Sequence, residues 1–164
     1  MRPGGINYEV LATLNLLRRS VITQGNEEVV VYRDKRYTYG EFLRRVFRLA
    51  DALIDAGIGN DDNVVFISPN NPPLLEAHFA VPLIGAVLVK IYTHRPPEEI
   101  VHVVNHSDPK ALFVYNEVAA LVRPYLGDFP NLRIIVNICE TSEERPLGGP
   151  EYEELLANHR TRMF

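Results

Sequence analysis

Residues 64–89 read VVFISPNNPPLLEAHFAVPLIGAVLV, and this stretch decides the fold class. Its first four residues form a short apolar run, which predicts a strand buried on both faces of a sheet. Residues 68–73 predict a turn, and residues 74–84 predict a mostly apolar helix that Pro82 must bend or end. Residues 86–89 predict a second strand of the buried type. This order is typical of a unit with parallel strands.

The same alternation continues further along the chain. Pro97 is expected to open a helix, because proline suits the first helical turn and Glu98 and Glu99 suit the positive end of the helix dipole. A third strand over 111–115, a helix over 117–126 that ends at Gly127, and a fourth strand over 132–138 follow. The sequence therefore predicts an α/β fold with a mostly parallel, doubly wound sheet flanked by helices on both faces.

Upstream, the pattern predicts a helix and a hairpin. Apolar residues at helical spacing between Asn7 and Gly25 predict the helix. Residues 28–32 and 36–38 predict two short strands joined by a polar turn, which together make a short N-terminal β-hairpin.

The next helix carries the clearest signals in the sequence. Thr38 and Glu41 predict a capping box, in which each side chain binds the backbone N–H of the other residue. Gly57, followed by the apolar Ile58, predicts the end of the helix. Arginines and aspartates are expected on the solvated face, opposite an apolar face made of Phe42, Val46, Leu49, Ala50 and Leu53.

The chain turns polar near its C-terminal end. Residues 140–150 are rich in glycine and proline and predict a loop, and residues 151–156 predict a short amphipathic helix. We therefore expect one domain over 1–139, followed by a linker and a short terminal helix over 140–164. A chain of 164 residues is long enough for one ordinary domain with a substantial core.

Charge and composition argue against several classes of protein. The formal net charge of −4 argues against a nucleic-acid binder. The basic clusters Arg18-Arg19 and Arg44-Arg45-Arg48 lie on predicted helices, and a solvated helix face explains them better than a phosphate contact. No apolar stretch approaches the roughly 18 residues that a membrane span needs.

The N-terminal residues and the single cysteine both indicate where the protein is expected to be located. Residues 1–5 lack the apolar core of a signal peptide, so the cytoplasm is the expected location. The single cysteine, Cys139, fits a reducing compartment. It follows an apolar run, so we expect a buried thiol at the end of a strand rather than a nucleophile.

The glycines do not predict a phosphate cradle. Such a cradle needs closely spaced glycines between a strand and a helix, so that backbone amides can approach the anion. Gly57 and Gly59 follow a helix instead, and Gly148-Gly149 leads into a proline. The turn after Ile67 lies where such a sheet would bind a ligand, yet residues 70–73 contain no glycine. No serine, carboxylate pair or other motif marks a catalytic site.

The histidines allow two interpretations. His102 and His106 lie four residues apart on one predicted helix and His94 lies shortly before it, so a metal site is one interpretation. A solvated helix face has the same pattern and is the interpretation that we favour. His78 lies within an apolar helix and is expected to be a hydrogen-bonded core or interface residue.

A series of blocks resembles the opening of the AMP-forming acyl-CoA synthetases, in that family's order and spacing from about residue 30 to residue 115. The resemblance is greatest to the medium- and long-chain fatty-acyl-CoA ligase branch. The blocks are Tyr37-Thr38-Tyr39 with Glu41-Phe42, Leu49-Ala50 with Leu53, Gly57-Ile58-Gly59, Pro69-Asn70-Asn71-Pro72, Glu76-Ala77-His78-Phe79-Ala80-Val81-Pro82, Gly85-Ala86-Val87-Leu88, Pro97-Glu98-Glu99-Ile100 and His106-Ser107.

The resemblance implies that this chain is the N-terminal portion of an enzyme and that this portion is inactive by itself. Members of the family adenylate a carboxylic acid with ATP and Mg²⁺ and then transfer the acyl group to the thiol of CoA. Their phosphate loop, adenine-binding segment, ribose-binding aspartate and C-terminal lysine have no counterpart in these 164 residues. No catalytic residue, metal ligand or resident cofactor is therefore expected in this chain. A missing C-terminal part or a second copy is the expected partner.

One corner of the sequence departs from the family pattern. Where relatives commonly read Asn-x-Arg-Leu, this chain has Tyr92-Thr93-His94-Arg95, and Lys90 replaces an apolar residue or proline. In some relatives the arginine of that corner lies near the nucleotide phosphates of CoA. The resemblance therefore implies His94 and Arg95 as candidate contacts of the CoA phosphates, with a solvated loop as the alternative.

The sequence also allows two other functions. The first is a scaffold or dimerisation module that kept the fold and lost the chemistry, with the apolar stretch 74–89 as its self-association surface. The second is a small nucleotide- or CoA-binding protein, against which the missing phosphate cradle counts. The fragment hypothesis itself predicts an exposed apolar face where a further subdomain packs.

Overall fold

The computed structural model describes residues 13–140 and 145–159 and divides the chain into two compact units, residues 1–43 and 44–164. The smaller unit contains α1 (Thr13–Gln24), β1 (Glu28–Tyr32), β2 (Lys35–Thr38) and the first turn of α2 (Tyr39–Asp55). The larger unit continues with α2 and then contains β3 (Asn63–Ile67), α3 (Pro72–Leu83), β4 (Val87–Ile91), α4 (Pro97–Ser107), β5 (Ala111–Tyr115), α5 (Asn116–Val122), the 3₁₀ helix η1 (Arg123–Asp128), β6 (Ile134–Ile138) and α6 (Tyr152–Asn158).

The smaller unit confirms the predicted hairpin and capping box. Strands β1 and β2 pair antiparallel across a two-residue turn, in which Arg33 has a φ of 54°. The backbone N–H of Glu41 donates to Oγ1 of Thr38 at 3.2 Å, and the N–H of Thr38 donates to Oε2 of Glu41 at 2.9 Å. Helix α1 ends where Gly25 predicted, whereas its expected start after Asn7 lies outside the described residues.

Helix α2 confirms the predicted apolar face and corrects the opposite one. The five apolar residues of that face are at most 2% exposed. Asp51, however, is 3% exposed, so the aspartates are not all on a solvated face. Gly57, with a φ of 77°, ends the helix as predicted: its N–H donates to the carbonyl of Ile54, and the N–H of Ile58 donates to that of Leu53.

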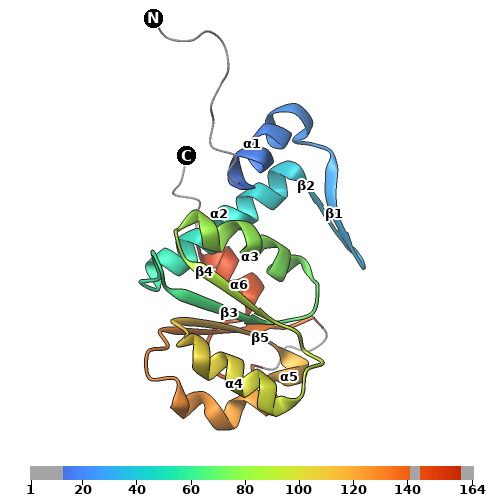
Figure 1. The fold of residues 1–164 in the computed structure, drawn as a ribbon. Helices are drawn as coiled ribbons and strands as arrows, with labels where there is room; N and C mark the ends of the chain where they lie inside the picture. Colours follow the sequence, from blue (N-terminus) through green and yellow to red (C-terminus); the bar gives the residue numbers. More distant parts are fainter. Residues whose placement is uncertain (1–12, 141–144, 160–164) are drawn as a thin grey trace, which may run out of the picture. The chain divides into compact units, whose positions relative to one another are not determined.

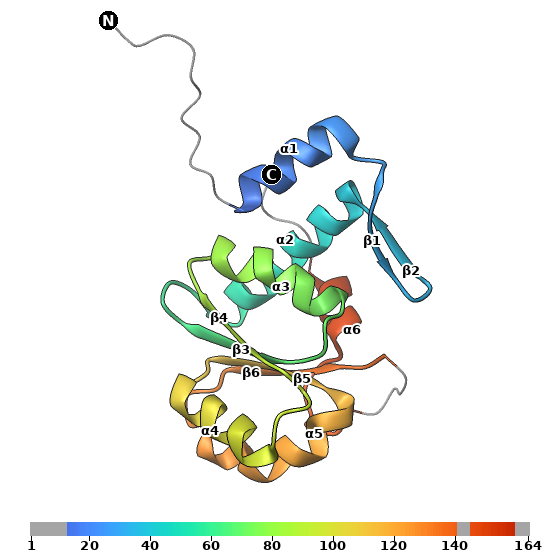
Figure 2. The same cartoon turned by 45° about the vertical axis from the view of Figure 1, so that its right-hand side comes forward.

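The larger unit is a four-stranded parallel sheet between two layers of helices, as the sequence predicted (Figure 1). The strand order is β4-β3-β5-β6. Figures 1 and 2 show α3, α6 and the C-terminal part of α2 over one face of the sheet, and α4 and α5 over the other.

The side chains of the central strands alternate between the two layers. On the α4 and α5 side one buried cluster joins strands and helices, and it contains Val65, Ile67, Ile91, Ile100, Val104, Leu112, Val114, Ala119 and Val122. On the other side the rings of Phe66 and Phe113 stack with centroids 4.2 Å apart, and Phe113 meets Tyr152 of α6 edge to face.

Strand β4 corrects the prediction of a strand buried on both faces. It lies at the edge of the sheet, where Val87 is 46% exposed and Lys90 is also exposed. The chain crosses from β4 past β3 to reach β5, so β3 and β5 are the central strands and β4 has a neighbour on one side. An apolar run of four residues does not reveal this order, because edge and centre can have the same composition.

Two helix boundaries also differ from the predictions. Helix α3 begins at Pro72 rather than at residue 74, because Oδ1 of Asn71 accepts a hydrogen bond from the N–H of Leu74 and caps the helix. The helix expected over 117–126 is α-helical up to Val122 and continues as the 3₁₀ helix η1, whose second residue is Pro124. Proline has no N–H to continue an α-helical ladder.

The segment after residue 144 packs against β6. The buried Asn137 donates its backbone N–H to the carbonyl of Pro150 at 3.0 Å and its Nδ2 to the carbonyl of Gly148 at 2.7 Å. Gly149, with a φ of 73°, lies so close to the carbonyl of Ile135 that a Cβ atom has no room. Helix α6 then follows, two residues longer at its C-terminal end than predicted.

Candidate functional site

A ligand site is expected at the carboxyl edge of the sheet. Strands β3 and β5 are neighbours although β4 lies between them in the sequence, so the strand order reverses at this pair. Open parallel sheets bind their ligands at such a reversal, outside the carboxyl ends of the strands. The loops that follow β3, β4 and β6 lie at this edge.

The loop after β3 is closed by its own hydrogen bonds. Oγ of Ser68 donates to Oδ1 of Asn71 at 3.1 Å, and Nδ2 of Asn71 donates to Oε1 of Glu140 at 3.0 Å. Ser68 and Asn71 are 2% and 5% exposed. Asn71 therefore links the loop after β3 to the segment that follows β6, and both polar atoms of its side chain form hydrogen bonds within the protein.

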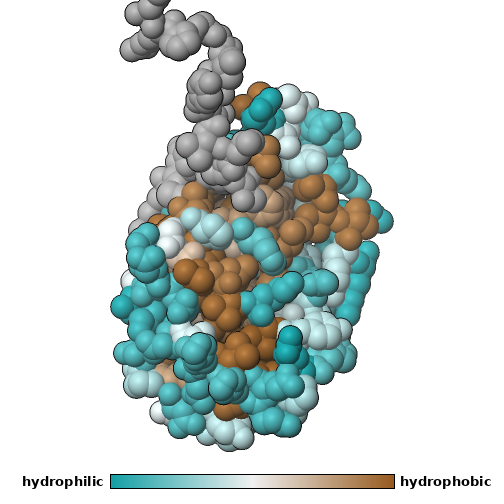
Figure 3. All heavy atoms as spheres, in the orientation of Figure 1, coloured by the Kyte–Doolittle hydropathy of each residue, from teal (hydrophilic) through white to brown (hydrophobic). Residues whose placement is uncertain are grey.

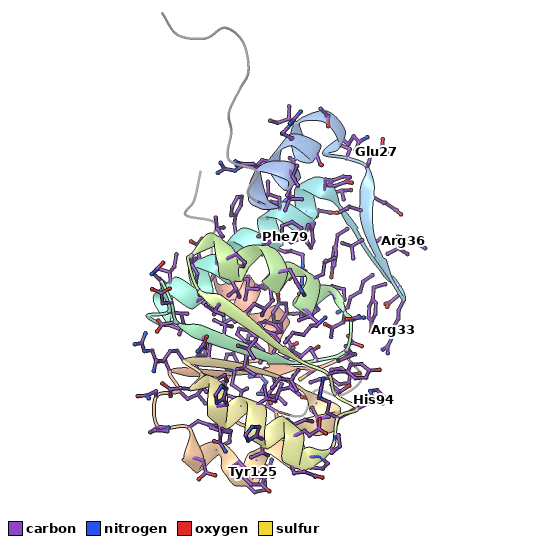
Figure 4. All side chains as sticks on the ribbon, in the orientation of Figure 1. Glu27, Arg33, Arg36, Phe79, His94 and Tyr125 are labelled. Atoms are coloured by element: carbon purple, nitrogen blue, oxygen red, sulfur yellow. The ribbon has the colours of Figure 1, made fainter. Side chains whose placement is uncertain are left out.

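The loop after β4 contains the two predicted CoA contacts. The rings of His94 and Tyr92 stack with centroids 4.9 Å apart, and Oγ1 of Thr93 lies 3.1 Å from Nδ1 of His94. Nη1 of Arg95 donates to Oε2 of Glu99 in the first turn of α4 at 2.9 Å. The structure brings His94 and Arg95 to one exposed corner, and Figure 4 shows His94 at the periphery of the larger unit.

The other predicted histidines fall in different places. The rings of His102 and His106 stack on the exposed face of α4 with centroids 6.3 Å apart, whereas His94 stacks on Tyr92. Among the described residues, no group of three or more histidine, cysteine, aspartate or glutamate side chains is placed to hold a metal ion. His78 is hydrogen-bonded, with Nδ1 2.7 Å from the carbonyl oxygen of Leu74, but it is exposed rather than part of the core.

Cys139 follows β6, so the predicted position at the end of a strand is correct. It is half-buried rather than fully buried. Burial raises the pKa of its thiol, and a hydrogen bond with Asn116 opposes that change. A raised pKa disfavours the thiolate, which agrees with the predicted inert role.

A buried charge cluster that no sequence motif indicated joins α2, α3 and α6. Nε of Arg45 lies 2.6 Å from Oε1 of Glu76, and its two terminal nitrogens lie 2.7 and 2.8 Å from the carboxylate oxygens of Glu153. Oη of Tyr152 donates to Oε2 of Glu76 at 2.5 Å. The buried charge cluster consists of four residues, Arg45, Glu76, Tyr152 and Glu153.

The cluster corrects the interpretation of Arg44-Arg45-Arg48 as one solvated face. The side chain of Arg45 is 14% exposed and that of Glu76 is fully buried. A carboxylate without water needs a cation and hydrogen-bond donors, and Arg45 and Tyr152 provide both. The sequence signal was Glu76 itself, a carboxylate in the apolar stretch 74–84.

Burial is the largest influence on the pKa values of Glu76 and Tyr152. It raises the pKa of Glu76, and the charge and hydrogen bond of Arg45 pull that pKa back down. It also raises the pKa of Tyr152 well above its ordinary value, and the nearby Glu76 carboxylate adds to the rise. The cluster holds α6 on α2 and α3.

A shallow pocket of about 230 Å³ lies beside β6. Its lining is mostly apolar, and its one charged side chain, Arg133, already pairs with the carbonyl of Gly57 and with Asp62. The lining residues are Leu132, Arg133, Ile134, Ile135, Leu147 and Gly149.

Comparison with known proteins gives one consistent result. The family described as "AMP-binding enzyme" matches residues 17–156. The chain is similar to 4-hydroxybutyrate–CoA ligase 2 of Metallosphaera sedula, with 42% identity over 68% of this chain and 20% of that protein. It is also similar to the peroxisomal trans-cinnamate:CoA ligase of Petunia hybrida, with 37% identity over 90% of this chain and 25% of that protein.

Solved structures share the fold. The anthranilate CoA ligase AuaEII in complex with anthranoyl-AMP superposes with a TM-score of 0.82 at 21% identity, over 92% of this chain and 28% of that one. A putative long-chain-fatty-acid CoA ligase from Rhodopseudomonas palustris superposes with a TM-score of 0.79 at 23% identity, over 90% of this chain and 36% of that one. The chain spans 20% to 29% of the length of the curated relatives that it matches.

The first prediction concerns the ion pair. Arg45→Met leaves the Glu76 carboxylate buried without its cation, so we expect the free energy of unfolding to fall by about 3–5 kcal/mol. The matched control is Arg44→Met, an exposed neighbour on the same helix, with a change within about 0.5 kcal/mol. Urea unfolding measures both, and adding Glu76→Gln to Arg45→Met is expected to recover part of the loss. Equal effects of the two single variants would contradict the assignment.

The second prediction concerns alkaline pH. Because folding raises the pKa of Tyr152, the folded state holds this proton more tightly than the unfolded state does. The stability that Tyr152 contributes is present below the ordinary tyrosine pKa of about 10 and declines above it by at most about 1.4 kcal/mol per pH unit. The stability gap between the parent and Tyr152→Phe should therefore narrow between pH 8 and pH 10.5 in urea melts.

The control for that experiment is Tyr125→Phe, which removes a tyrosine hydroxyl from a side chain that is 38% exposed. Its stability gap to the parent should stay the same at both pH values. A gap for Tyr152→Phe that is also constant would contradict the prediction.

Proposed function

The chain belongs to the AMP-binding enzyme family, and we propose that it is the N-terminal part of an ATP-dependent acid–CoA ligase. Such an enzyme adenylates a carboxylic acid and then transfers the acyl group to the thiol of CoA. The observation that carries the proposal is the family match over residues 17–156, together with relatives that are CoA ligases of which this chain spans 20% to 29%. The division into one domain over 1–139 and a linker with a terminal helix over 140–164 stays part of the proposal.

The described loops at the carboxyl edge do not fit the triphosphate of ATP. The loops after β3 and β4 contain no glycine that could bring backbone amides close to a phosphate. Gly149, which follows β6, is needed where the backbone passes the carbonyl of Ile135. We therefore assign ATP and Mg²⁺ to the rest of the ligase and propose that this chain is inactive by itself.

For the acid substrate we propose a fatty acid. The support is the resemblance of the sequence blocks to the medium- and long-chain ligase branch. The relatives' names cover hydroxybutyrate, cinnamate, benzoate and butyrate, so the assay must compare several acid classes.

Among the described residues, no helix is long and apolar enough to cross a membrane. We propose the cytoplasm as the location, although the Petunia relative is peroxisomal.

A second candidate function is a scaffold or dimerisation module with the same fold. The observation that favours it is the exposure of apolar side chains within the stretch 74–89, where Leu75 is 42% exposed and Val87 is 46% exposed. Figure 3 shows apolar surface over α3. The same surface suits the packing of a further ligase subdomain, so its exposure alone does not separate the two functions.

The third prediction distinguishes the ligase fragment from the scaffold. We expect no ATP–pyrophosphate exchange from the 164-residue chain with butyrate, octanoate, palmitate or benzoate. The coding DNA after the Phe164 codon should contain, in the same or a shifted frame, a Ser/Thr/Gly-rich loop that ends in Pro-Lys-Gly. A protein that includes this segment should catalyse the exchange, most rapidly with the fatty acids.

The opposite results are equally specific. Exchange by the chain alone would contradict the proposed inactivity. A monodisperse oligomer at micromolar concentration, with no ligase sequence downstream, would favour the scaffold. Fast exchange with benzoate and none with the fatty acids would keep the ligase and overturn its proposed substrate.

We further propose that the corner after β4 contacts the phosphates of CoA, through His94 and Arg95. The corner is exposed and basic, and Lys90 lies on the preceding strand. Arg95 pairs with Glu99, and both side chains are at least half exposed, so a phosphate can replace Glu99 at small cost. Arginine suits this role because its planar guanidinium binds phosphate oxygens in pairs.

The fourth prediction tests this corner in the complete ligase. Arg95→Ala should raise the KM for CoA by roughly three- to tenfold, the loss of one charge-assisted contact, and should leave kcat at saturating CoA unchanged. Glu99→Gln, which releases the guanidinium, should not raise this KM, and Arg44→Ala serves as a charge-matched control elsewhere. An unchanged KM for CoA in Arg95→Ala would remove the corner from the binding site.

A further inference from the structure

Two histidines on α4 form a pair that no part of the ligase proposal uses. His102 and His106 are both exposed, and their rings lie nearly parallel, with an interplanar angle of 15° and centroids 6.3 Å apart. They are four residues apart on an 11-residue helix, so both side chains leave the helix on one face, one turn apart.

The packing of α4 fixes this face toward solvent. Ile100 is fully buried and Val104 is 1% exposed, and both belong to the apolar cluster on the α4 and α5 side of the sheet. Each of these anchors lies two residues from a histidine of the pair, on the opposite side of the helix. A rotation that hid the histidines would expose the anchors, so the pair is held outward by the core.

We propose that His102 and His106 bind one divalent transition-metal ion of borderline softness, such as Ni²⁺, Cu²⁺ or Zn²⁺, between their imidazoles. Neutral imidazole nitrogen is the ligand these ions favour, and two histidines at this helical spacing can reach the same ion. Mg²⁺ and Ca²⁺ prefer oxygen ligands and are not expected to bind.

Among the described residues, no third histidine, cysteine, aspartate or glutamate is placed to join the pair at one ion, so the site has two protein ligands. Glu99 lies two turns before His106, and His94 is stacked on Tyr92 in the loop before the helix. Glu98 lies one turn before His102 and two turns before His106, so it cannot join both histidines at one ion. Water completes the coordination, which makes this an exposed surface site rather than a closed structural one.

The fifth prediction is tested by titrating the tag-free 164-residue chain with NiCl₂ in a calorimeter. We expect one ion per chain and an increase in melting temperature with added Ni²⁺, because the ion binds the folded helix. His102→Ala and His106→Ala should each weaken binding by about tenfold or more, because the second imidazole then no longer binds intramolecularly. MgCl₂ should give no binding.

Two further variants keep the test sharp. His94→Ala removes an exposed histidine outside the pair and should bind Ni²⁺ like the parent. Adding Glu98→His to His106→Ala recreates the four-residue spacing one turn earlier, with His102, and should restore the affinity. Parent-like binding by His102→Ala or His106→Ala, failure of the recreated pair, or no stoichiometric binding by the parent would each overturn the proposal.

Discussion

The burial of one carboxylate, Glu76, constrains the whole helical layer on its side of the sheet. This side chain is fully removed from water, so its charge must be compensated by a cation and hydrogen-bond donors inside the protein. Arg45 of α2 and Tyr152 of α6 meet it at 2.6 and 2.5 Å, and Arg45 then binds both carboxylate oxygens of Glu153. Three helices that are distant in sequence are therefore fixed by one set of charge-assisted hydrogen bonds.

This constraint explains why the short helix α6 is part of the larger unit. A helix of seven residues has little stability of its own. Its place depends on the buried charge cluster, on the edge-to-face contact of Tyr152 with Phe113, and on Asn137, which holds the preceding segment against β6. Polar groups thus hold this helical layer together on the apolar sheet.

The carboxyl edge of the sheet is organised for structure more than for chemistry. Asn71 uses its side chain to cap α3 and to bind Glu140, and Gly149 is required where the backbone passes close to the carbonyl of Ile135. We propose the exposed basic corner at His94 and Arg95 as the part of this edge that contacts a phosphate, because the Arg95–Glu99 ion pair is at least half exposed. This arrangement agrees with our proposal that the remainder of the ligase supplies the nucleotide chemistry, since the chain spans 20% to 29% of the related CoA ligases.

The sequence alone determined the features that depend on neighbours along the chain. The capping box at Thr38 and Glu41, the glycine stop at Gly57, and the alternation of strands and helices all follow from local hydrogen bonding and side-chain periodicity. The packing of distant segments determines that β4 is an edge strand and that Arg45 is mostly buried. It also determines that, among the described residues, His94 forms no three-residue metal-binding group with His102 and His106. These features depend on which distant segments meet, and a single sequence records the composition of each segment but not its partner.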